Sequence, residues 1–153
     1  MKGLIIGLAL CLSLSAFSAN HEIEDSDSGI HGPKYAEILK SMEKWQAAFP
    51  SISRIEQYGT SVKGKPLKML IVGKNRKKSS RARPAFMMSG STHGNEYLNI
   101  EDRLPEALLK ETLSEGAVKT FIEEEGVFIF IPILNPDGYD SRKRENSHGV
   151  DLN

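Results

Sequence analysis

The sequence predicts an α/β fold, and three consecutive segments carry this prediction. Residues 84–90 (PAFMMSG) and 126–136 (GVFIFIPILNP) are near-continuous apolar runs, which are typical of strands buried on both faces. Between them, residues 99–113 (NIEDRLPEALLKETL) have the pattern of a helix, although Pro105 interrupts it. A strand, a helix and a second strand in this order indicate a parallel βαβ unit.

The segments before this unit add a helix and a hairpin. Residues 34–49 predict a helix between Pro33 and Pro50, because apolar side chains recur every three or four residues and form one stripe. The stripe consists of Tyr35, Ile38, Leu39, Met42 and Trp45. Residues 51–61 and 65–74 predict two strands, joined by a short connection that contains a glycine.

The amino-terminal segment has the features of an export signal. Residues 1–19 contain one lysine, an apolar core and then small residues, which predicts a secretory signal peptide. The core, Leu4–Leu14, is too short for a transmembrane helix. Cys11, the only cysteine, lies inside it, so we expect a mature chain without disulfides. Residues 20–33 predict a flexible acidic leader. A secreted or periplasmic protein with no stable membrane anchor after cleavage is therefore expected.

Composition argues against a nucleic-acid or membrane-surface partner. The formal net charge is +0, with 26% charged and 39% hydrophobic residues, as in an ordinary globular domain. Residues 75–83 (NRKKSSRAR) are basic, but no aromatic residues lie between the charges, so a solvated loop is the better interpretation.

His93 and Glu96 are candidate metal ligands. They lie three residues apart in STHGNE, directly after a predicted strand, where ligands bind in open α/β sheets. In a helical or turn-like segment this spacing places both side chains on one side, and zinc accepts an imidazole and a carboxylate. The alternative is an ordinary helix start, with Ser91 or Thr92 as cap and Glu96 as a first-turn acid. Residues 90–99 (GSTHGNEYLN) alone leave both interpretations, metal site and helix start, open.

A second polar segment follows the next predicted strand. Asn135–Gly138 (NPDG) fits a type I turn, and residues 142–153 (RKRENSHGVDLN) contain cations, amides and an acid. A hydrolase that cleaves beside a carboxylate needs a cation for the oxyanion, donors for the carboxylate and an acid to orient a metal-bound histidine. A charged surface loop would also explain this composition.

Together, these pieces resemble the zinc carboxypeptidase family of carboxypeptidase A. The match runs from about Tyr35 to Asn153, through HGNE, NPDGY and RENSHGVDLN in that order and spacing. The resemblance implies that residues 34–153 are the amino-terminal part of the catalytic domain, with a mixed, largely parallel sheet covered by helices on both faces. It also implies Zn²⁺ as cofactor, hydrolysis of carboxy-terminal peptide bonds, and a peptide substrate with a free carboxylate.

The same resemblance assigns individual roles. His93 and Glu96 correspond to the first two zinc ligands. Arg144 corresponds to the arginine that polarises the scissile carbonyl and contacts the substrate, with Arg142 as its rival. Asn153 corresponds to an asparagine that holds the substrate carboxylate. Asp151 corresponds to the acid that lies behind the first histidine ligand and orients it.

Two departures from the family pattern keep other readings open. Asn95 replaces the arginine found before the glutamate in the animal enzymes, and HGNE also resembles the aspartoacylase and succinylglutamate desuccinylase branch, which usually lacks NPDG. A third zinc ligand and a general base cannot be assigned, since His148 matches no ligand of the family. We therefore expect a truncated, incomplete and inactive fragment. The alternatives are an aspartoacylase-like zinc amidohydrolase and a non-catalytic binding remnant.

Overall fold

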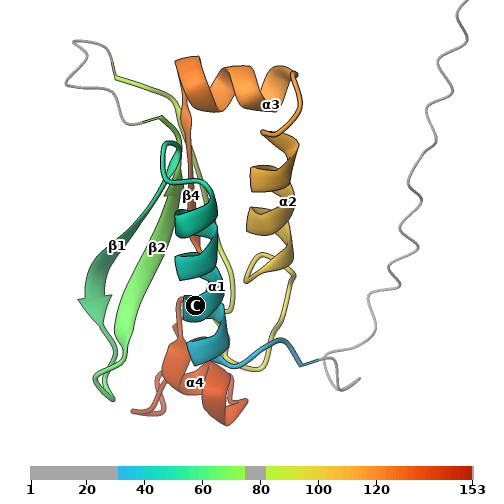
Figure 1. The fold of residues 1–153 in the computed structure, drawn as a ribbon. Helices are drawn as coiled ribbons and strands as arrows, with labels where there is room; N and C mark the ends of the chain where they lie inside the picture. Colours follow the sequence, from blue (N-terminus) through green and yellow to red (C-terminus); the bar gives the residue numbers. More distant parts are fainter. Residues whose placement is uncertain (1–30, 75–81, 153) are drawn as a thin grey trace, which may run out of the picture.

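The computed structural model describes residues 31–74 and 82–152 (Figure 1). The predicted signal peptide, most of the predicted leader and the proposed substrate residue Asn153 lie outside these residues. The elements are α1 (Tyr35–Ala48), β1 (Ser53–Thr60), β2 (Pro66–Val72), β3 (Ala85–Ser89), α2 (Arg103–Glu111), α3 (Ala117–Thr120), the π-helical turn η1 (Phe121–Glu125), β4 (Val127–Ile131) and α4 (Pro136–Ser141). No helix among the described residues has the length and hydropathy needed to cross a bilayer.

The four strands form one mixed sheet in the order β1-β2-β4-β3. β1 and β2 are an antiparallel hairpin, and β2 also pairs antiparallel with β4. β3 and β4 pair in parallel, with Ser89 opposite Ile131 at their carboxyl ends. The predicted α/β class and the βαβ unit are confirmed. Within these strands, the parallel pairing is confined to β3 and β4.

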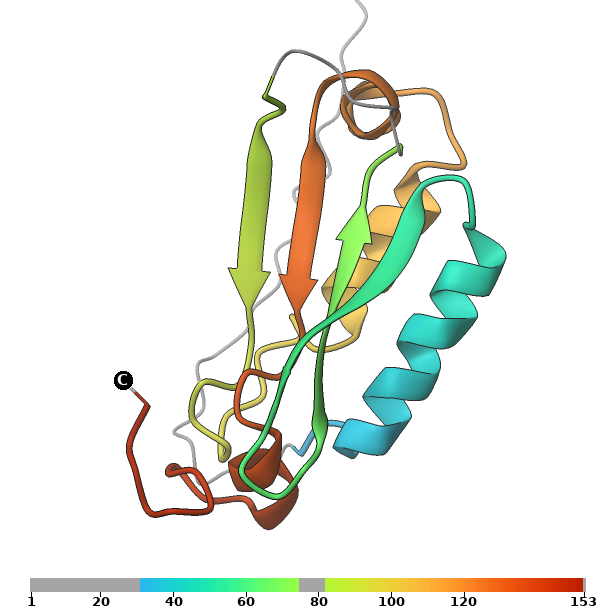
Figure 2. The ribbon, with the colours of Figure 1, turned by 90° about the vertical axis from the view of Figure 1, so that its left-hand side faces the viewer.

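Both long helices pack on the same face of the sheet (Figures 1 and 2). α1 leads directly into β1, and α2 belongs to the crossover between β3 and β4, so each returns to the face that presents Leu70 and Phe130. The expectation of helices on both faces is therefore not met within the described residues. Burial of residues 84–90 on both faces is also wrong for these residues. β3 is the edge strand, and Met87 and Phe86 are 67% and 56% exposed.

The core lies between α1, α2 and the covered face of the sheet. The predicted stripe of α1 is confirmed, because Tyr35, Ile38 and Met42 are buried and Leu39 and Trp45 pack against them. The other fully or nearly buried apolar side chains of this core are Ile52, Leu70, Val72, Leu109, Ile122, Phe130, Ile133 and Tyr139.

The second predicted helix begins later than its sequence pattern suggests. α2 starts at Arg103, where the Asp102 side chain accepts a hydrogen bond from the Arg103 N–H. Pro105 falls in the first turn, where an N–H has no partner within the helix, so it does not break α2. Residues 90–102 are turns and irregular chain. His93 and Glu96 consequently lie in a loop rather than at a helix start.

Candidate metal centre

The two polar segments singled out in the sequence meet at the carboxyl ends of β3 and β4. Both strands run in the same direction, so residues 90–102 and 132–152 leave the sheet at one end (Figure 2). The Gly90 N–H donates to Ile131 O at 2.9 Å, the Leu134 N–H to Gly90 O at 3.0 Å, and the Asn135 N–H to Ser91 O at 3.1 Å. These bonds continue the strand pairing into the loops and fix their relative position.

His93 and Glu96 face each other within this loop. A turn closed by the Glu96 N–H and His93 O, 3.2 Å apart, brings the side chains to one side. Nδ1 of His93 lies 2.8 Å from Oε1 of Glu96. His93 is 8% exposed, whereas the Glu96 side chain is 34% exposed. The pair therefore opens to solvent on the glutamate side.

Arg144 and Asp151 complete the surroundings of the imidazole. Nη1 of Arg144 lies 3.2 Å from His93 Nδ1, and its Nε donates to Asp151 Oδ2 at 2.8 Å. Oδ1 of Asp151 lies 3.3 Å from His93 Nε2, on the other side of the ring. The resemblance expected Glu96 and Asp151 close to this histidine and gave Arg144 the scissile carbonyl. In the structure Glu96, Arg144 and Asp151 all contact the imidazole nitrogens.

His93 Nδ1 and Glu96 Oε1 are suited to bind a zinc ion together. Nδ1 faces an acceptor, Glu96 Oε1, and a donor, Arg144 Nη1, and one nitrogen atom cannot accept from one and donate to the other in the same tautomer. A cation between Nδ1 and the carboxylate removes this conflict, because both atoms then act as electron-pair donors. Nε2 would carry the proton toward Asp151. Nε2 is buried, and its 3.3 Å contact with Asp151 Oδ1 is not aligned as a hydrogen bond; a proton fixed on Nε2 would be directed at this carboxylate.

Other candidate residues do not join this centre. Among the described residues, no group of three or more His, Cys, Asp or Glu side chains could hold a metal ion together. His148 is exposed. Arg142, the rival of Arg144, has a φ of 54° at the end of α4. Its side chain lines a small cavity together with Lys34, Glu96 and Tyr139.

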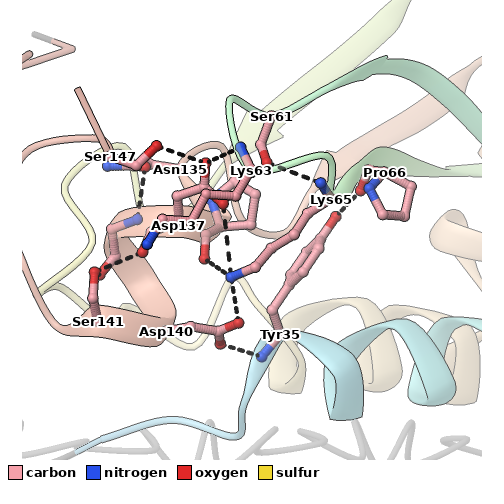
Figure 3. Close-up of polar contacts among 12 residues, drawn as sticks. Tyr35, Ser61, Lys63, Lys65, Pro66, Asn135, Asp137, Asp140, Ser141 and Ser147 are labelled. Carbon is pink, nitrogen blue, oxygen red and sulfur yellow. Dashed lines mark hydrogen bonds and ion pairs between the residues drawn. The ribbon is translucent and has the colours of Figure 1, made fainter.

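A buried carboxylate that sequence reasoning missed supports the loop carrying Arg144 (Figure 3). Asp137 is 3% exposed and accepts hydrogen bonds from Ser61 Oγ and the Lys63 N–H, both at 3.0 Å, and from Ser147 Oγ at 3.2 Å. The Lys65 ammonium lies 3.7 Å away. Burial by itself would raise the pKa of Asp137, but these donors outweigh it and lower the pKa. Asp137 thus ties the β1–β2 turn to α4 and to the following loop.

The NPDG and HGNE segments also pack backbone against backbone. Asn135 is 2% exposed and caps α4 by accepting from the Gly138 N–H at 3.0 Å, so the expected turn continues into a short helix. Its Nδ2 donates to Arg144 O at 3.3 Å, and the Gly94 N–H donates to the same oxygen at 3.3 Å. A Cβ at Gly94 would lie 2.0 Å from the Gly138 carbonyl carbon, so glycine is needed for this approach.

Comparison with known proteins identifies the family. A family model described as zinc carboxypeptidase matches residues 38–153. The chain belongs to the zinc carboxypeptidase family. Carboxypeptidase SOL1 of Arabidopsis thaliana is 33% identical over 119 residues, which are 76% of this chain and 24% of the relative. The catalytic chain of human carboxypeptidase N is 29% identical over 135 residues, 78% of this chain and 29% of the relative. The chain thus spans about a quarter of the length of these curated carboxypeptidases.

Solved carboxypeptidases share the fold. The crystal structure of thrombin activatable fibrinolysis inhibitor superposes with a TM-score of 0.62 at 23% identity, covering 74% of this chain and 29% of that one. Carboxypeptidase A from Helicoverpa armigera gives a TM-score of 0.58 at 21% identity, covering 74% and 28%. The zinc carboxypeptidase fold is therefore confirmed for the described sheet and helices.

Proposed function

We propose that this chain contributes the first part of a zinc-dependent carboxypeptidase site, which hydrolyses carboxy-terminal peptide bonds. The observation that carries the proposal is the convergence of His93 Nδ1 and Glu96 Oε1, 2.8 Å apart, at the carboxyl ends of two parallel strands. The segment that contains both residues lies within the match to the zinc carboxypeptidase family.

In this proposal, each residue near the imidazole has a separate task. A bound Zn²⁺ would polarise the scissile carbonyl and lower the pKa of a bound water. His93 and Glu96 hold the ion, and Asp151 keeps the proton of His93 on Nε2 and so leaves Nδ1 free to bind. Arg144 is anchored through Nε by Asp151, and Nη1 lies 3.2 Å from His93 Nδ1. With Nδ1 bound to zinc, the Nη groups would hydrogen-bond a substrate carbonyl or carboxylate oxygen.

The substrate class follows from this cation and from the family. We propose a peptide with a free carboxy-terminal carboxylate, held in part by Asn153. Export of the protein through residues 1–19 would place it where peptides outside the cell or in the periplasm are available. Hydrolysis of an acyl amide, the aspartoacylase-like alternative, ranks lower because the family match includes both the HGNE and the NPDG segments.

A non-catalytic binding role is the second candidate. It is favoured by the gathering of only two ligand side chains at one point among the described residues. The inactive metallocarboxypeptidase ECM14 of Ajellomyces capsulatus, 28% identical over 131 residues, which are 75% of this chain and 21% of the relative, shows that the family has inactive members.

The test is a zinc titration followed by nuclear magnetic resonance of the histidine ring nitrogens. We expect the Nδ1 signal of His93 to move on addition of zinc, and the His148 signals to stay. Glu96→Gln should abolish the shift, whereas His148→Ala should leave it unchanged. An unchanged His93 spectrum at saturating zinc, or a shift that survives Glu96→Gln, would overturn the ligand assignment.

A further inference from the structure

Glu101 is a buried carboxyl group for which the proposed reaction has no use. It is 0% exposed, and none of the ion pairs found among the described residues includes it. A buried carboxylate without a cation is costly, so its protonation state needs an explanation. It lies in the loop between Glu96 and α2, close to the candidate metal pair in sequence but not in contact with the imidazole.

The hydrogen bonds around Ser91 require one proton more than the serine supplies. Ser91 Oγ lies 2.7 Å from Glu101 Oε1 and 2.9 Å from Glu96 O. Both neighbours accept if Glu101 is ionised, yet the hydroxyl group has a single hydrogen to donate. A proton on Glu101 Oε1 resolves the count, because Glu101 then donates to Ser91 Oγ and Ser91 donates to Glu96 O. Oε2 meanwhile accepts from the Leu98 N–H at 3.0 Å.

We propose that Glu101 is held as a neutral carboxylic acid that positions the His93–Glu96 loop. The chain of bonds runs from Glu101 through the Ser91 hydroxyl group to the carbonyl of Glu96, and the second oxygen holds the backbone two residues farther on. The role in metal binding rests on the proposed function, whereas the protonation state does not.

Two further features indicate that the loop after β3 is folded around the Glu101 carboxyl group. Ser91 has a φ of 46°, an uncommon value for a residue with a side chain, so its conformation needs fixed partners. A Cβ at Gly90 would lie 2.7 Å from Glu101 Oε1, so the glycine leaves the space that the carboxyl group fills. The chain that leaves β3 is therefore shaped around Glu101.

The surrounding charges also disfavour an ionised Glu101. Burial is the main cause that raises its pKa, and the neighbouring carboxylate of Asp102 adds to it. The hydrogen bonds from Ser91, from the N–H of Glu101 itself and from the Leu98 N–H lower the pKa, but burial outweighs them.

Glu101→Gln tests the proposal, since a glutamine amide group donates and accepts as the neutral acid does. We expect the variant to shift the His93 signals with zinc at an affinity within threefold of the original chain. Glu101→Leu keeps the bulk but loses both bonds, and we expect at least tenfold weaker zinc binding. If Glu101→Leu does not fold, Ser91→Ala breaks the same chain of bonds at the smaller residue and should weaken zinc binding in the same direction.

Unfolding as a function of pH gives a readout independent of zinc. A raised folded-state pKa means that the stabilisation by Glu101 is full below the unfolded-chain pKa of about 4.3 and is lost as pH rises through the folded pKa. Glu101→Gln should therefore gain stability relative to the original chain as pH rises. The proposal would be overturned if Glu101→Gln lost stability relative to the original chain as pH rises. It would also be overturned if the original chain showed no infrared band of a protonated carboxyl group that Glu101→Gln removes. Neither result depends on whether zinc binds.

Discussion

Gly94 and Gly138 meet backbone to backbone, so that a methyl group on Gly94 would lie 2.0 Å from the carbonyl carbon of Gly138. This contact joins the loop that carries His93 to the turn that leads to Arg144. The close approach of these two loops thus depends on the glycine of HGNE lying against the glycine of NPDG.

Gly94→Ala should disrupt the candidate site. The added Cβ meets backbone atoms that cannot rotate away, so the two loops must separate. We expect a loss of about 1–3 kcal/mol in the free energy of unfolding, the usual range for overpacking. Gly116→Ala is the matched control, because its Cβ would have no neighbour within 4 Å. Thermal unfolding of both variants checks this, and equal melting temperatures would contradict it.

Asp137→Asn should lower stability in a pH-dependent way. The amide cannot accept all three hydrogen bonds and forfeits the nearby Lys65 charge, which we expect to cost about 1–3 kcal/mol. Since the folded pKa of Asp137 is lowered, its stabilisation exists above the unfolded-chain pKa of about 3.9 and is lost as pH falls through the folded pKa. The difference between the two proteins should therefore vanish in strong acid.

Chemical denaturation at several pH values measures this difference. Glu111→Gln is the control, since Glu111 is exposed and its replacement should change stability by less than about 0.5 kcal/mol. A constant deficit of Asp137→Asn across the whole pH range would show that shape, rather than charge, explains the effect.

Zinc should bind the 153-residue chain weakly. Among the described residues only two ligand side chains converge, so most of the ion's coordination shell stays as water. If zinc at ~1 mM only matches the dissociation constant, the gain is about 0.4 kcal/mol. The corresponding shift in melting temperature is about 1 °C. Calorimetry and thermal scans with and without chelator test this expectation. A tight one-to-one site abolished by His148→Ala would mean that this histidine closes the shell.

The open face of the sheet should limit solubility. Met87 on β3 is 67% exposed, and β3 is an edge strand of the sheet formed by the described residues, a combination that favours association. We expect Met87→Lys to reduce the sedimenting aggregate at an unchanged melting temperature. Met42→Lys, which introduces the same charge at a side chain that is 0% exposed, should unfold the protein. Equal aggregation of the original chain and Met87→Lys would refute the role of this face.

Local patterns in the sequence were enough to predict the two long helices and the four strands, but not the short elements α3, η1 and α4 or the surroundings of each strand. The stripe from Tyr35 to Trp45 and the apolar runs at β3 and β4 depend on neighbours in sequence, and they gave the helix, the strands and the βαβ unit. Which faces of β3 are covered depends on the paths of α1 and α2, and no residue of β3 encodes those paths. Residues 84–90 were therefore wrongly expected to be buried on both faces.

In the candidate site, too, contacts between sequence neighbours could be predicted, whereas contacts that depend on the tertiary fold could not. His93 and Glu96 are close in sequence, so their spacing alone suggested a pair. Asp137 and Ser61 are 76 positions apart, and their bond depends on the sheet bringing the hairpin turn beside α4. Glu101 fell inside the predicted helix at residues 99–113, where it resembled any other charged residue of that helix. Its burial follows from the turn at Ser91, which no pattern in the sequence announced.

The register of β3 and β4 sets the relative position of the two loops that form the candidate centre. Ser89 pairs with Ile131, and the bonds of Gly90 and Ser91 to the other loop follow directly from that pairing. A slip of one residue would displace one loop against the other by about 3.3 Å. The glycines would then no longer meet, and Arg144 would leave the imidazole. An engineer who transplants this centre must therefore carry the ends of both strands along with the loops.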